Sequence, residues 1–215
     1  MTMDKKSLLK EANYYYITDE DSKVPLVQQV KTAVKKGVKI IQYRKKSGTD
    51  REMYEEVKKA KGICDDEALL IVNDRVDVAL AADADGVHLG QDDLPAEEVR
   101  GLAGDLLIGV STHEMEEVEE VQLKADYIAV GPVHETKTKT NTADELGVEK
   151  AKEIARTLQV PTAAIGGVEE TDLESLCEVF DMVCAISSVT RKGELSERID
   201  HFEKKIEECK RRERR

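Results

Sequence analysis

Short apolar segments recur at regular intervals along the chain, separated by longer charged segments in which apolar residues return with helical spacing. This alternation is typical of repeated βα units. Eight segments fit strands, at residues 14–17, 39–42, 69–72, 86–89, 107–110, 127–130, 162–165 and 182–185. Their near-continuous content of Val, Ile, Leu and Ala predicts a parallel sheet that helices bury on both faces.

The segments between these strands predict the helices that would cover the sheet. The clearest helical patterns span 26–36, 51–63, 96–102, 115–123, 148–158, 170–179 and 195–211. Eight βα units in 215 residues, undivided by any linker rich in Gly, Pro and Ser, favour an α/β fold with a single (β/α)8 TIM barrel over residues 1–215. Two doubly wound domains are the alternative.

The charge balance is acidic and limits the class of partner. The chain has 33 Lys and Arg against 45 Asp and Glu, a net charge of −12. Because phosphate neutralisation supplies much of the affinity for DNA, a nucleic-acid partner is not expected. No apolar run approaches the roughly 18–20 residues of a membrane helix, and the first residues lead into no hydrophobic stretch, so we expect a cytoplasmic protein without a membrane partner. A phosphate-bearing ligand would have to meet a local cluster of positive charge.

The four cysteines, Cys64, Cys177, Cys184 and Cys209, form no close pair. Neither a zinc site nor a disulfide framework is indicated, and reduced thiols are expected. The sequence leaves open whether the partners, beyond small-molecule substrates, include a second copy of the chain.

The second predicted strand ends in a basic segment, Gln42-Tyr43-Arg44-Lys45-Lys46. In a TIM barrel the loops after the strands build the active site. Alternate residues of an extended segment point the same way, so Gln42, Arg44 and Lys46 are expected to face the barrel mouth while Tyr43 and Lys45 face elsewhere. Two cations and an amide suit a diphosphate and a polar ring. The alternative is a solvated strand end paired with surface carboxylates.

A second basic segment follows the sixth predicted strand and consists of Thr136, Lys137, Thr138 and Lys139. As part of a polar loop, it could close over the same mouth. The two segments together would supply the local positive charge that the chain as a whole lacks.

Two carboxylates, Asp74 and Asp93, follow the third and fourth predicted strands. Mg²⁺ binds one or two protein carboxylates together with phosphate oxygens and water, so this pair beside a diphosphate predicts a magnesium site. The alternative pairs Asp74 with Arg75 or Arg44 as a structural bridge and makes Asp93 the N-cap of the next helix.

Gly166 and Gly167 follow the seventh strand, where this fold commonly binds phosphate through bare backbone amides. A tight βα turn would use the same residues.

His88, between Val87 and Leu89, fits a hydrogen-bonded core or rim histidine better than a metal ligand, and Cys184 fits a small wall residue.

Taken in order, the motifs resemble those of the thiamine-phosphate synthase family. They are Tyr16-Ile17-Thr18-Asp19, Gln42-Tyr43-Arg44-Lys45-Lys46, Val72-Asn73-Asp74-Arg75-Val76-Asp77, the segment 84–93 ending in Gly90-Gln91-Asp92-Asp93, Ile108-Gly109-Val110-Ser111, the segment 126–133, Thr136-Lys137-Thr138-Lys139 and Ala164-Ile165-Gly166-Gly167. The resemblance spans roughly residues 13–190. It implies a TIM barrel that joins 4-amino-2-methyl-5-hydroxymethylpyrimidine diphosphate to 4-methyl-5-(2-phosphoethyl)thiazole, giving thiamine phosphate and pyrophosphate.

The resemblance also implies roles for single residues. Those implied to contact the pyrimidine diphosphate are Gln42, Arg44, Lys46, Asn73, Ser111 and Lys139, of which Arg44, Lys46 and Lys139 are the expected catalytic cations. Mg²⁺ would be held by Asp74 and Asp93. The thiazole phosphate would meet Thr136, Thr138, Gly167 and the backbone of Val183 and Cys184, and Tyr43, Lys45 and Lys137 complete the expected substrate-binding set. The implied reaction is dissociative, with the diphosphate leaving first and no protein nucleophile.

The chain departs from the family pattern at three places. Lys45 stands where the family usually has Glu, Cys184 replaces a common Ser, and Val179-Phe180 precedes Asp181 where Gly and Ala are usual. Rival functions on the same barrel are a thiazole tautomerase or regulator, a non-catalytic phosphate-ligand sensor, and a phosphate-binding isomerase. The first has no need of Asp74 and Asp93, and the last needs an acid–base pair that the strand ends do not offer.

Overall fold

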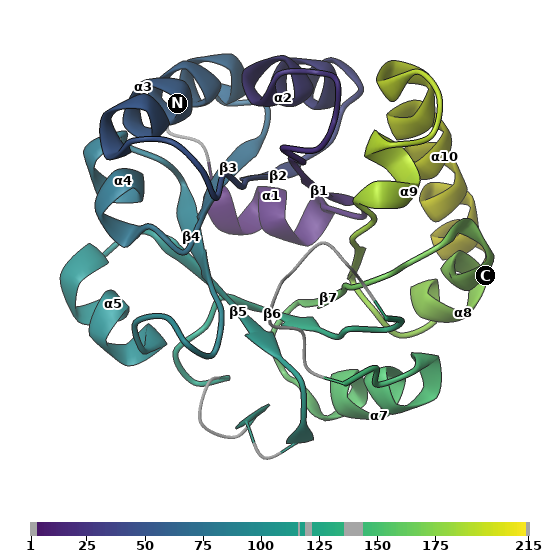
Figure 1. Ribbon diagram of the computed structural model, residues 1–215. Helices are drawn as coiled ribbons and strands as arrows, with labels where there is room; N and C mark the ends of the chain where they lie inside the picture. The colour runs from purple at the N-terminus through teal and green to yellow at the C-terminus, as the bar shows by residue number, and fades with distance from the viewer. Residues whose placement is uncertain (1–3, 116, 119–121, 136–143, 214–215) are drawn as a thin grey trace.

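The computed structural model describes residues 4–115, 117–118, 122–135 and 144–213. Within them eight parallel strands form one sheet in chain order (Figure 1). The strands are β1 (Tyr15–Ile17), β2 (Ile40–Tyr43), β3 (Leu69–Asn73), β4 (Gly86–Leu89), β5 (Leu107–Thr112), β6 (Tyr127–Val130), β7 (Thr162–Ala164) and β8 (Met182–Val183). A parallel bridge between Tyr14 and Val183 joins the first strand to the last and closes the barrel.

The prediction of a (β/α)8 barrel is confirmed. Every strand begins and ends within two residues of the segment predicted for it. The doubly wound alternative is wrong, because that architecture reverses its strand order at a switch point whereas here each strand pairs with its successor.

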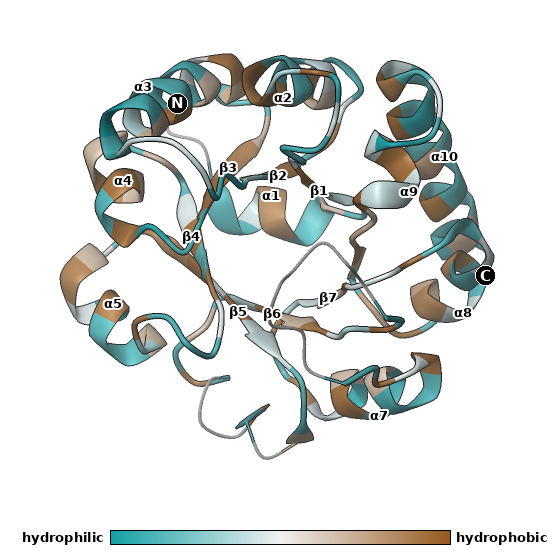
Figure 2. Ribbon diagram, viewed as in Figure 1, coloured by the Kyte–Doolittle hydropathy of each residue, from teal (hydrophilic) through white to brown (hydrophobic). Residues whose placement is uncertain are grey.

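Helices surround the sheet, except α1, which lies inside their ring in this view (Figure 1), and the helices carry hydrophobic and hydrophilic residues on different faces (Figure 2). They are α1 (Lys5–Glu11), α2 (Leu26–Lys35), α3 (Asp50–Cys64), α4 (Val76–Ala81), α5 (Ala96–Ala103), α7 (Val148–Thr157), α8 (Leu173–Cys177), α9 (Ser187–Thr190) and α10 (Leu195–Glu213), with a 3-10 turn, η1 (Glu170–Asp172). The predicted helix 170–179 is η1 followed by α8. The predicted helix 115–123 lies partly outside the described residues.

Three helices were not predicted individually: α1, α4 and α9. Helix α4 has six residues, Val-Asp-Val-Ala-Leu-Ala, and α9 has four, so neither is long enough to show a helical period. Helix α1 begins at the side chain of Asp4, which accepts hydrogen bonds from the backbone N–H groups of Lys6 and Ser7.

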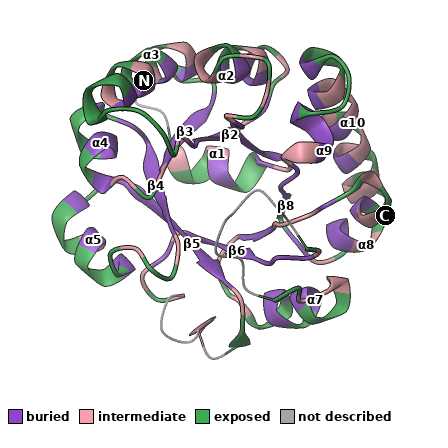
Figure 3. Cartoon of the chain, in the orientation of Figure 1, coloured by how far each residue is buried: buried purple, intermediate pink, exposed green. Residues whose placement is uncertain are grey.

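Two apolar cores hold the barrel together. The outer core lies between the strands and the helices, and strands are buried while helices expose their outer faces (Figure 3). The inner core fills the barrel itself with side chains such as Ile40, Leu69, Leu107 and Met182, and Leu9 of α1 packs against it. Because apolar side chains fill the inner core, the polar groups that enter the barrel stand out as functional candidates.

Candidate active site

The end of β2 sends alternate side chains to opposite sides of the sheet. Gln42 points into the barrel, where its Nε2 donates to the Tyr15 hydroxyl at 2.7 Å. Tyr43 and Lys45 point the other way and both contact Glu56 of α3: the Tyr43 hydroxyl donates to it, and Lys45 Nζ lies 3.0 Å from Oε1. Their side chains are thus bound to the helical layer.

Arg44 is buried at this strand end, with 8% of its surface exposed. Its backbone is held by Thr18, whose Oγ1 accepts from Arg44 N at 2.9 Å and donates to Arg44 O at 3.3 Å. Burial lowers the pKa of the guanidinium, and the carboxylates of Asp74, Glu20, Asp19 and Asp21 act against that shift. Neighbouring carboxylates therefore stabilise the charged form of the Arg44 guanidinium even without a ligand.

Lys46 is exposed, but its backbone is fixed by a residue that the sequence did not single out. The Glu20 carboxylate accepts from Lys46 N at 2.5 Å, from Ser47 Oγ at 2.7 Å and from Ser47 N at 3.3 Å. Burial raises the Glu20 pKa, but these hydrogen bonds and Arg44 outweigh it, so the pKa lies below its ordinary value. Glu20, in the loop after β1, thereby positions the loop that carries Lys46.

Asp74 lies directly beyond β3 in a left-handed conformation, with φ of 61°. Its N–H donates to the His88 carbonyl of β4 at 2.9 Å, which continues the β3–β4 ladder. Asn73, the half-buried last residue of β3, pairs in register with His88. Arg75 pairs with Asp50 at 2.7 Å and with Asp77 at 2.6 Å. The structural alternative paired Asp74 with either Arg75 or Arg44. Because Arg75 pairs with other carboxylates and the negative charge of Asp74 acts on the Arg44 guanidinium, Arg44 is the better candidate of the two.

Asp93 is tied to the end of β4, because its Oδ2 accepts from Gly90 N at 2.7 Å. It is not the cap of α5, which starts at Ala96 with Pro95 in the N-cap position. Two carboxylates held close to the ends of adjacent strands have the donor chemistry that Mg²⁺ takes when phosphate and water complete its shell. Among the described residues, no group of three or more His, Cys, Asp or Glu could hold a metal ion.

A continuous line of hydrogen bonds crosses the inside of the barrel; we call it the lumen chain. From Gln42 it runs to Tyr15, whose hydroxyl lies 2.7 Å from that of Tyr127. The Tyr127 hydroxyl lies 3.0 Å from His88 Nδ1, and His88 Nε2 lies 2.9 Å from Ser111 Oγ. All five side chains are at most 3% exposed. The interpretation of His88 as a hydrogen-bonded core residue is confirmed, while the roles of Tyr15 and Tyr127 were not predicted.

The turn after β7 has the two glycines in left-handed conformations, with φ of 89° at Gly166 and 66° at Gly167. A Cβ on Gly167 would lie 2.7 Å from the Cβ of His134, and one on Gly166 would lie 2.5 Å from the Cβ of Pro132. The turn therefore requires glycine for its backbone and for close packing against the β6 loop. These glycines would serve a tight turn with or without a bound anion.

The backbone N–H groups at the end of β8 take part in the sheet. Val183 N donates to the Asn13 carbonyl at 2.9 Å and Cys184 N donates to the Ala164 carbonyl at 2.8 Å. Both N–H groups are thus used in closing the sheet, and the expected contact of the Val183 and Cys184 backbone with the thiazole phosphate stays a prediction. Cys184 is buried, 1% exposed, among the inner-core residues, in keeping with a wall residue.

The remaining predicted residues, Thr136, Lys137, Thr138 and Lys139, lie outside the described residues. Their roles stay predictions.

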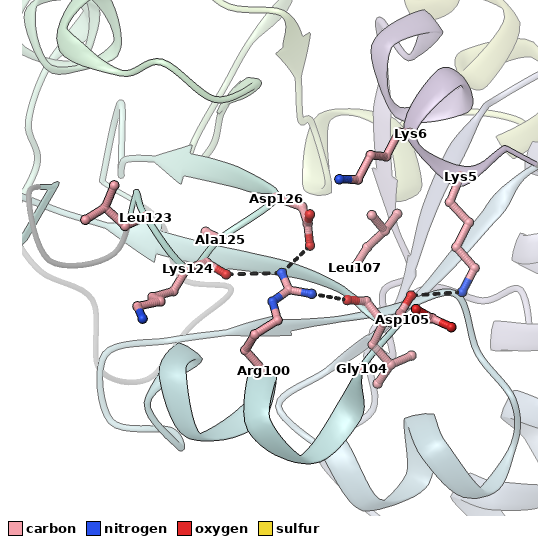
Figure 4. Close-up of a pocket in the computed structure, with 11 residues that line it drawn as sticks. Lys5, Lys6, Arg100, Gly104, Asp105, Leu107, Leu123, Lys124, Ala125 and Asp126 are labelled. Carbon is pink, nitrogen blue, oxygen red and sulfur yellow. Dashed lines mark hydrogen bonds and ion pairs between the residues drawn. The ribbon is translucent and has the colours of Figure 1, made fainter.

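A cavity of about 450 Å³ lies at the opposite end of the barrel, between α1, α5 and the segments that precede β5 and β6 (Figure 4). Arg100 donates there to the Leu106 and Lys124 carbonyls and to the Asp126 carboxylate. Lys5 Nζ lies 3.3 Å from the Asp105 carbonyl. These cations hold the loops of the N-terminal face together, far from the strand ends described above.

Polar and charged side chains from several strands meet at one end of a closed barrel, the end at which TIM barrels carry their catalytic groups. Fold and site together define a TIM-barrel enzyme. No helix among the described residues is long and apolar enough to cross a membrane.

Comparison with known proteins identifies the family. A model described as thiamine monophosphate synthase matches residues 14–189. A thiamine-phosphate synthase of Methanosarcina barkeri is 41% identical over 202 residues, 92% of either chain. One of Pelotomaculum thermopropionicum is 42% identical over 173 residues, 77% of this chain and 78% of its own. The structure of thiamine phosphate pyrophosphorylase from Pyrococcus furiosus matches with a TM-score of 0.86 at 35% identity, over 94% of this chain and 98% of that one. The chain belongs to the thiamine monophosphate synthase family, as its motifs predicted.

Proposed function

We propose that this enzyme of thiamine biosynthesis condenses 4-amino-2-methyl-5-hydroxymethylpyrimidine diphosphate with 4-methyl-5-(2-phosphoethyl)thiazole, giving thiamine phosphate and pyrophosphate. One observation carries the proposal beyond family membership. The negative charge of Asp74, at the end of β3, acts on the buried guanidinium of Arg44 at the end of β2. Asp93 is held just beyond β4 by the backbone N–H of Gly90. A cation beside one carboxylate, with a second carboxylate held beyond the next strand, suits a diphosphate that arrives with a divalent cation.

The diphosphate would bind to Arg44, Lys46, Asn73 and Lys139. Asp74 and Asp93 would hold Mg²⁺, which supplies neutralisation of the charge that develops on the departing diphosphate. Arg44 is well suited to its part, because it is buried and its backbone is held by Thr18. A cation fixed in advance stabilises developing charge without the cost of reorganisation.

The pyrimidine ring would lie over Gln42 and Ser111, at the two ends of the lumen chain. The thiazole phosphate would bind near Thr136, Thr138 and Gly167. A dissociative course suits this arrangement, in which the diphosphate leaves first and the thiazole nitrogen captures the pyrimidine methyl cation. Buried phenols line the barrel, and burial raises the pKa of both Tyr15 and Tyr127, so neither is an anionic nucleophile near neutral pH.

The test is a turnover assay with both substrates and MgCl₂, followed by mass spectrometry for thiamine phosphate and a coupled assay for pyrophosphate. We expect both products in equal amounts, and their loss when EDTA is added. Binding of the thiazole phosphate without turnover would instead identify a non-catalytic sensor, and turnover that EDTA does not affect would overturn the metal role.

A further inference from the structure

An imidazole that lies between two carboxylates joins the loop after β6 to the turn after β7. His134 Nε2 lies 3.0 Å from Oδ2 of Asp172, the last residue of η1. His134 Nδ1 lies 3.3 Å from Oε1 of Glu145, which precedes α7. We call these three side chains the His134 clamp. None of them has a part in the proposed reaction.

The clamp is built onto the glycine turn that we place against the thiazole phosphate. His134 N donates to the Gly166 carbonyl at 3.0 Å, and a Cβ on Gly167 would lie 2.7 Å from the Cβ of His134. The Asp172 side chain is 13% exposed, and its Oδ2 also accepts from Glu169 N at 2.8 Å. The position of the imidazole is therefore coupled directly to that of Gly167.

Both contacts of the ring can be hydrogen bonds only if the clamp holds a proton that neutral histidine lacks. Each imidazole nitrogen carries either one proton or one lone pair, so a neutral ring donates to one carboxylate and turns a lone pair toward the other. A carboxylic acid ordinarily loses its proton at lower pH than an imidazolium, so the additional proton belongs on the ring. Burial lowers the His134 pKa, but Asp172 and Glu145 outweigh it, so this pKa lies above its ordinary value.

The charges around the ring are mostly negative. Among the described residues they are those of Glu135 and Glu145 on its own loop, Asp172 and Glu169 on the side of η1, and Lys192, which pairs with Glu169 at 3.0 Å. The β7 turn, residues 165–167, is uncharged. One imidazolium against two carboxylates gives the clamp a net charge of −1, which becomes −2 when the ring is neutral. Loss of the proton therefore breaks a contact and also adds repulsion toward an anion at Gly167.

We propose that His134 is a positioning residue whose proton holds the Gly166–Gly167 turn in place for the thiazole phosphate, so that deprotonation weakens binding of this substrate more than binding of the pyrimidine diphosphate. The inference rests on the proposed function, because it takes Gly167 as the position of the thiazole phosphate. The diphosphate should depend less on the clamp, because Arg44 and Asn73 lie at the ends of β2 and β3, which face β6 and β7 across the closed barrel.

The first experiment follows the imidazole in the ligand-free enzyme, labelled with ¹⁵N-histidine, over a pH titration. The His134 signal is identified by its loss in His134→Gln. We expect a His134 pKa above the ordinary value of about 6.5, and a lower pKa in Asp172→Asn and in Glu145→Gln, which each remove one carboxylate charge. A pKa at or below the ordinary value, or one that neither variant changes, would overturn the clamp. No turnover is needed, so this result stands even if the proposed reaction is wrong.

The second experiment measures KM for each substrate, with the other saturating, at pH 6.5 and pH 9. In the wild type we expect the KM for the thiazole phosphate to rise by about fivefold, less than a fully buried charge-assisted hydrogen bond would give because the ring is 37% exposed. The KM for the diphosphate should change much less.

His134→Gln is neutral at both pH values and should have the raised KM for the thiazole phosphate at both. Titration of the substrate phosphate itself would appear equally in this variant. A purely structural role for His134 predicts the same pH dependence in the variant as in the wild type. That result, or parallel changes in the two KM values, would refute the proposal.

His201→Gln is the matched control, because His201 is 41% exposed and also pairs with a carboxylate, that of Glu170 at 3.0 Å, but lies on α10. Its pH dependence should equal that of the wild type. If the wild-type enzyme forms no thiamine phosphate, the proposed function fails while the ¹⁵N titration still decides the clamp. If turnover is normal and the KM for the thiazole phosphate does not rise with pH, the inference alone fails.

Discussion

The barrel has no room for a side chain larger than a hydrogen atom at Gly109. A Cβ there would lie 2.0 Å from Cζ and 2.3 Å from the hydroxyl oxygen of Tyr127. Gly109→Ala must push the Tyr127 ring aside, so we expect a loss of ~1–3 kcal/mol or more from overpacking. Urea unfolding followed by circular dichroism measures it.

The matched control is Gly62→Ala in α3, where an added Cβ meets nothing within 4 Å. A helix-interior Gly to Ala change should stabilise by ~0.5–1 kcal/mol. Equal stabilities for the two variants would show that the Tyr127 ring moves without cost.

Asp74 and Asp93 allow a direct test of the metal role. Asp74→Asn or Asp93→Asn keeps the size and removes a charge, so each should raise the Mg²⁺ concentration needed for half-maximal rate and lower turnover on the order of 10²-fold. Initial rates over a magnesium titration measure both effects. Asp66→Asn, an exposed change in the loop between α3 and β3, is the control and should leave the titration unaltered. Full activity of both site variants at low Mg²⁺ would show that Asp74 and Asp93 have only a structural role.

The sequence predicts the direction of some single side chains but not their contacts with distant parts of the chain. Alternation along an extended segment predicts that Gln42 and Tyr43 point to opposite sides, because it depends only on neighbours in the chain. No local pattern predicts that the hydroxyls of Tyr15 and Tyr127, 112 residues apart, meet inside the barrel. The same holds for Glu20, whose contacts with Lys46 and Ser47 join loops from two different units.

At the scale of elements, α10 carries a carboxyl group in an unusual setting. Burial, together with the charge of Glu207, raises the Glu203 pKa to about 7, although Lys39 acts in the opposite direction. The charge of Glu203 also acts on Tyr14, which directly precedes β1. Within the described residues, Glu203 Oε2 is buried without a hydrogen-bond partner. The charged form is therefore disfavoured in the folded state only.

The sign of the pH effect follows from that difference. Between the unfolded carboxyl pKa near ~4.3 and about 7, the folded state binds more protons than the unfolded state, so Glu203 costs stability as pH rises through this window. Glu203→Gln should lie close to wild type near pH 4.5 and exceed it by ~3 kcal/mol at pH 8. Thermal unfolding at the two pH values measures this, with the exposed Glu208→Gln as control. A constant difference between wild type and Glu203→Gln would refute the raised pKa.

Elements differ in how well the sequence predicts them, for a physical reason. The strands are buried on both faces and so appear as continuous apolar runs, and α2, α3 and α10 have 10, 15 and 19 residues, enough turns to show a period. The four residues of α9 form a helix because the closed barrel places them, not because of a local pattern.

At the scale of the whole molecule, the barrel closes where its two ends meet. The β1–β8 seam has the single bridge between Tyr14 and Val183, whereas neighbouring pairs such as β4 and β5 align four residues on each strand. A buried carboxylate beyond the seam adds to this closure: Asp19 accepts from Arg191 Nε at 2.8 Å and from Thr190 Oγ1 at 2.7 Å. The loop after β1 is thus bound to the last residue of α9 and to the residue that follows it.

Arg191→Met should therefore weaken the seam. Burial raises the Asp19 pKa, but Arg191, Thr190 and the Asp21 N–H outweigh it and hold that pKa below its ordinary value. The stabilisation is thus present above the unfolded pKa of about 3.9 and is lost as pH falls through the folded value. We expect the variant to lose ~1–2 kcal/mol at pH 7, with the difference from wild type shrinking below pH 4.

Hydrogen exchange locates the effect, because opening of the seam should expose the Val183 N–H, which donates to the Asn13 carbonyl, while the amides of β4 and β5 on the far side of the barrel stay protected. Lys192→Met is the matched control: Lys192 is 58% exposed and pairs with the half-exposed Glu169, a surface contact worth little, so its loss should change stability by less than ~0.5 kcal/mol. Faster exchange spread evenly over all eight strands in Arg191→Met would mean that the barrel opens as a unit, and that the seam is no weaker than the rest of the sheet.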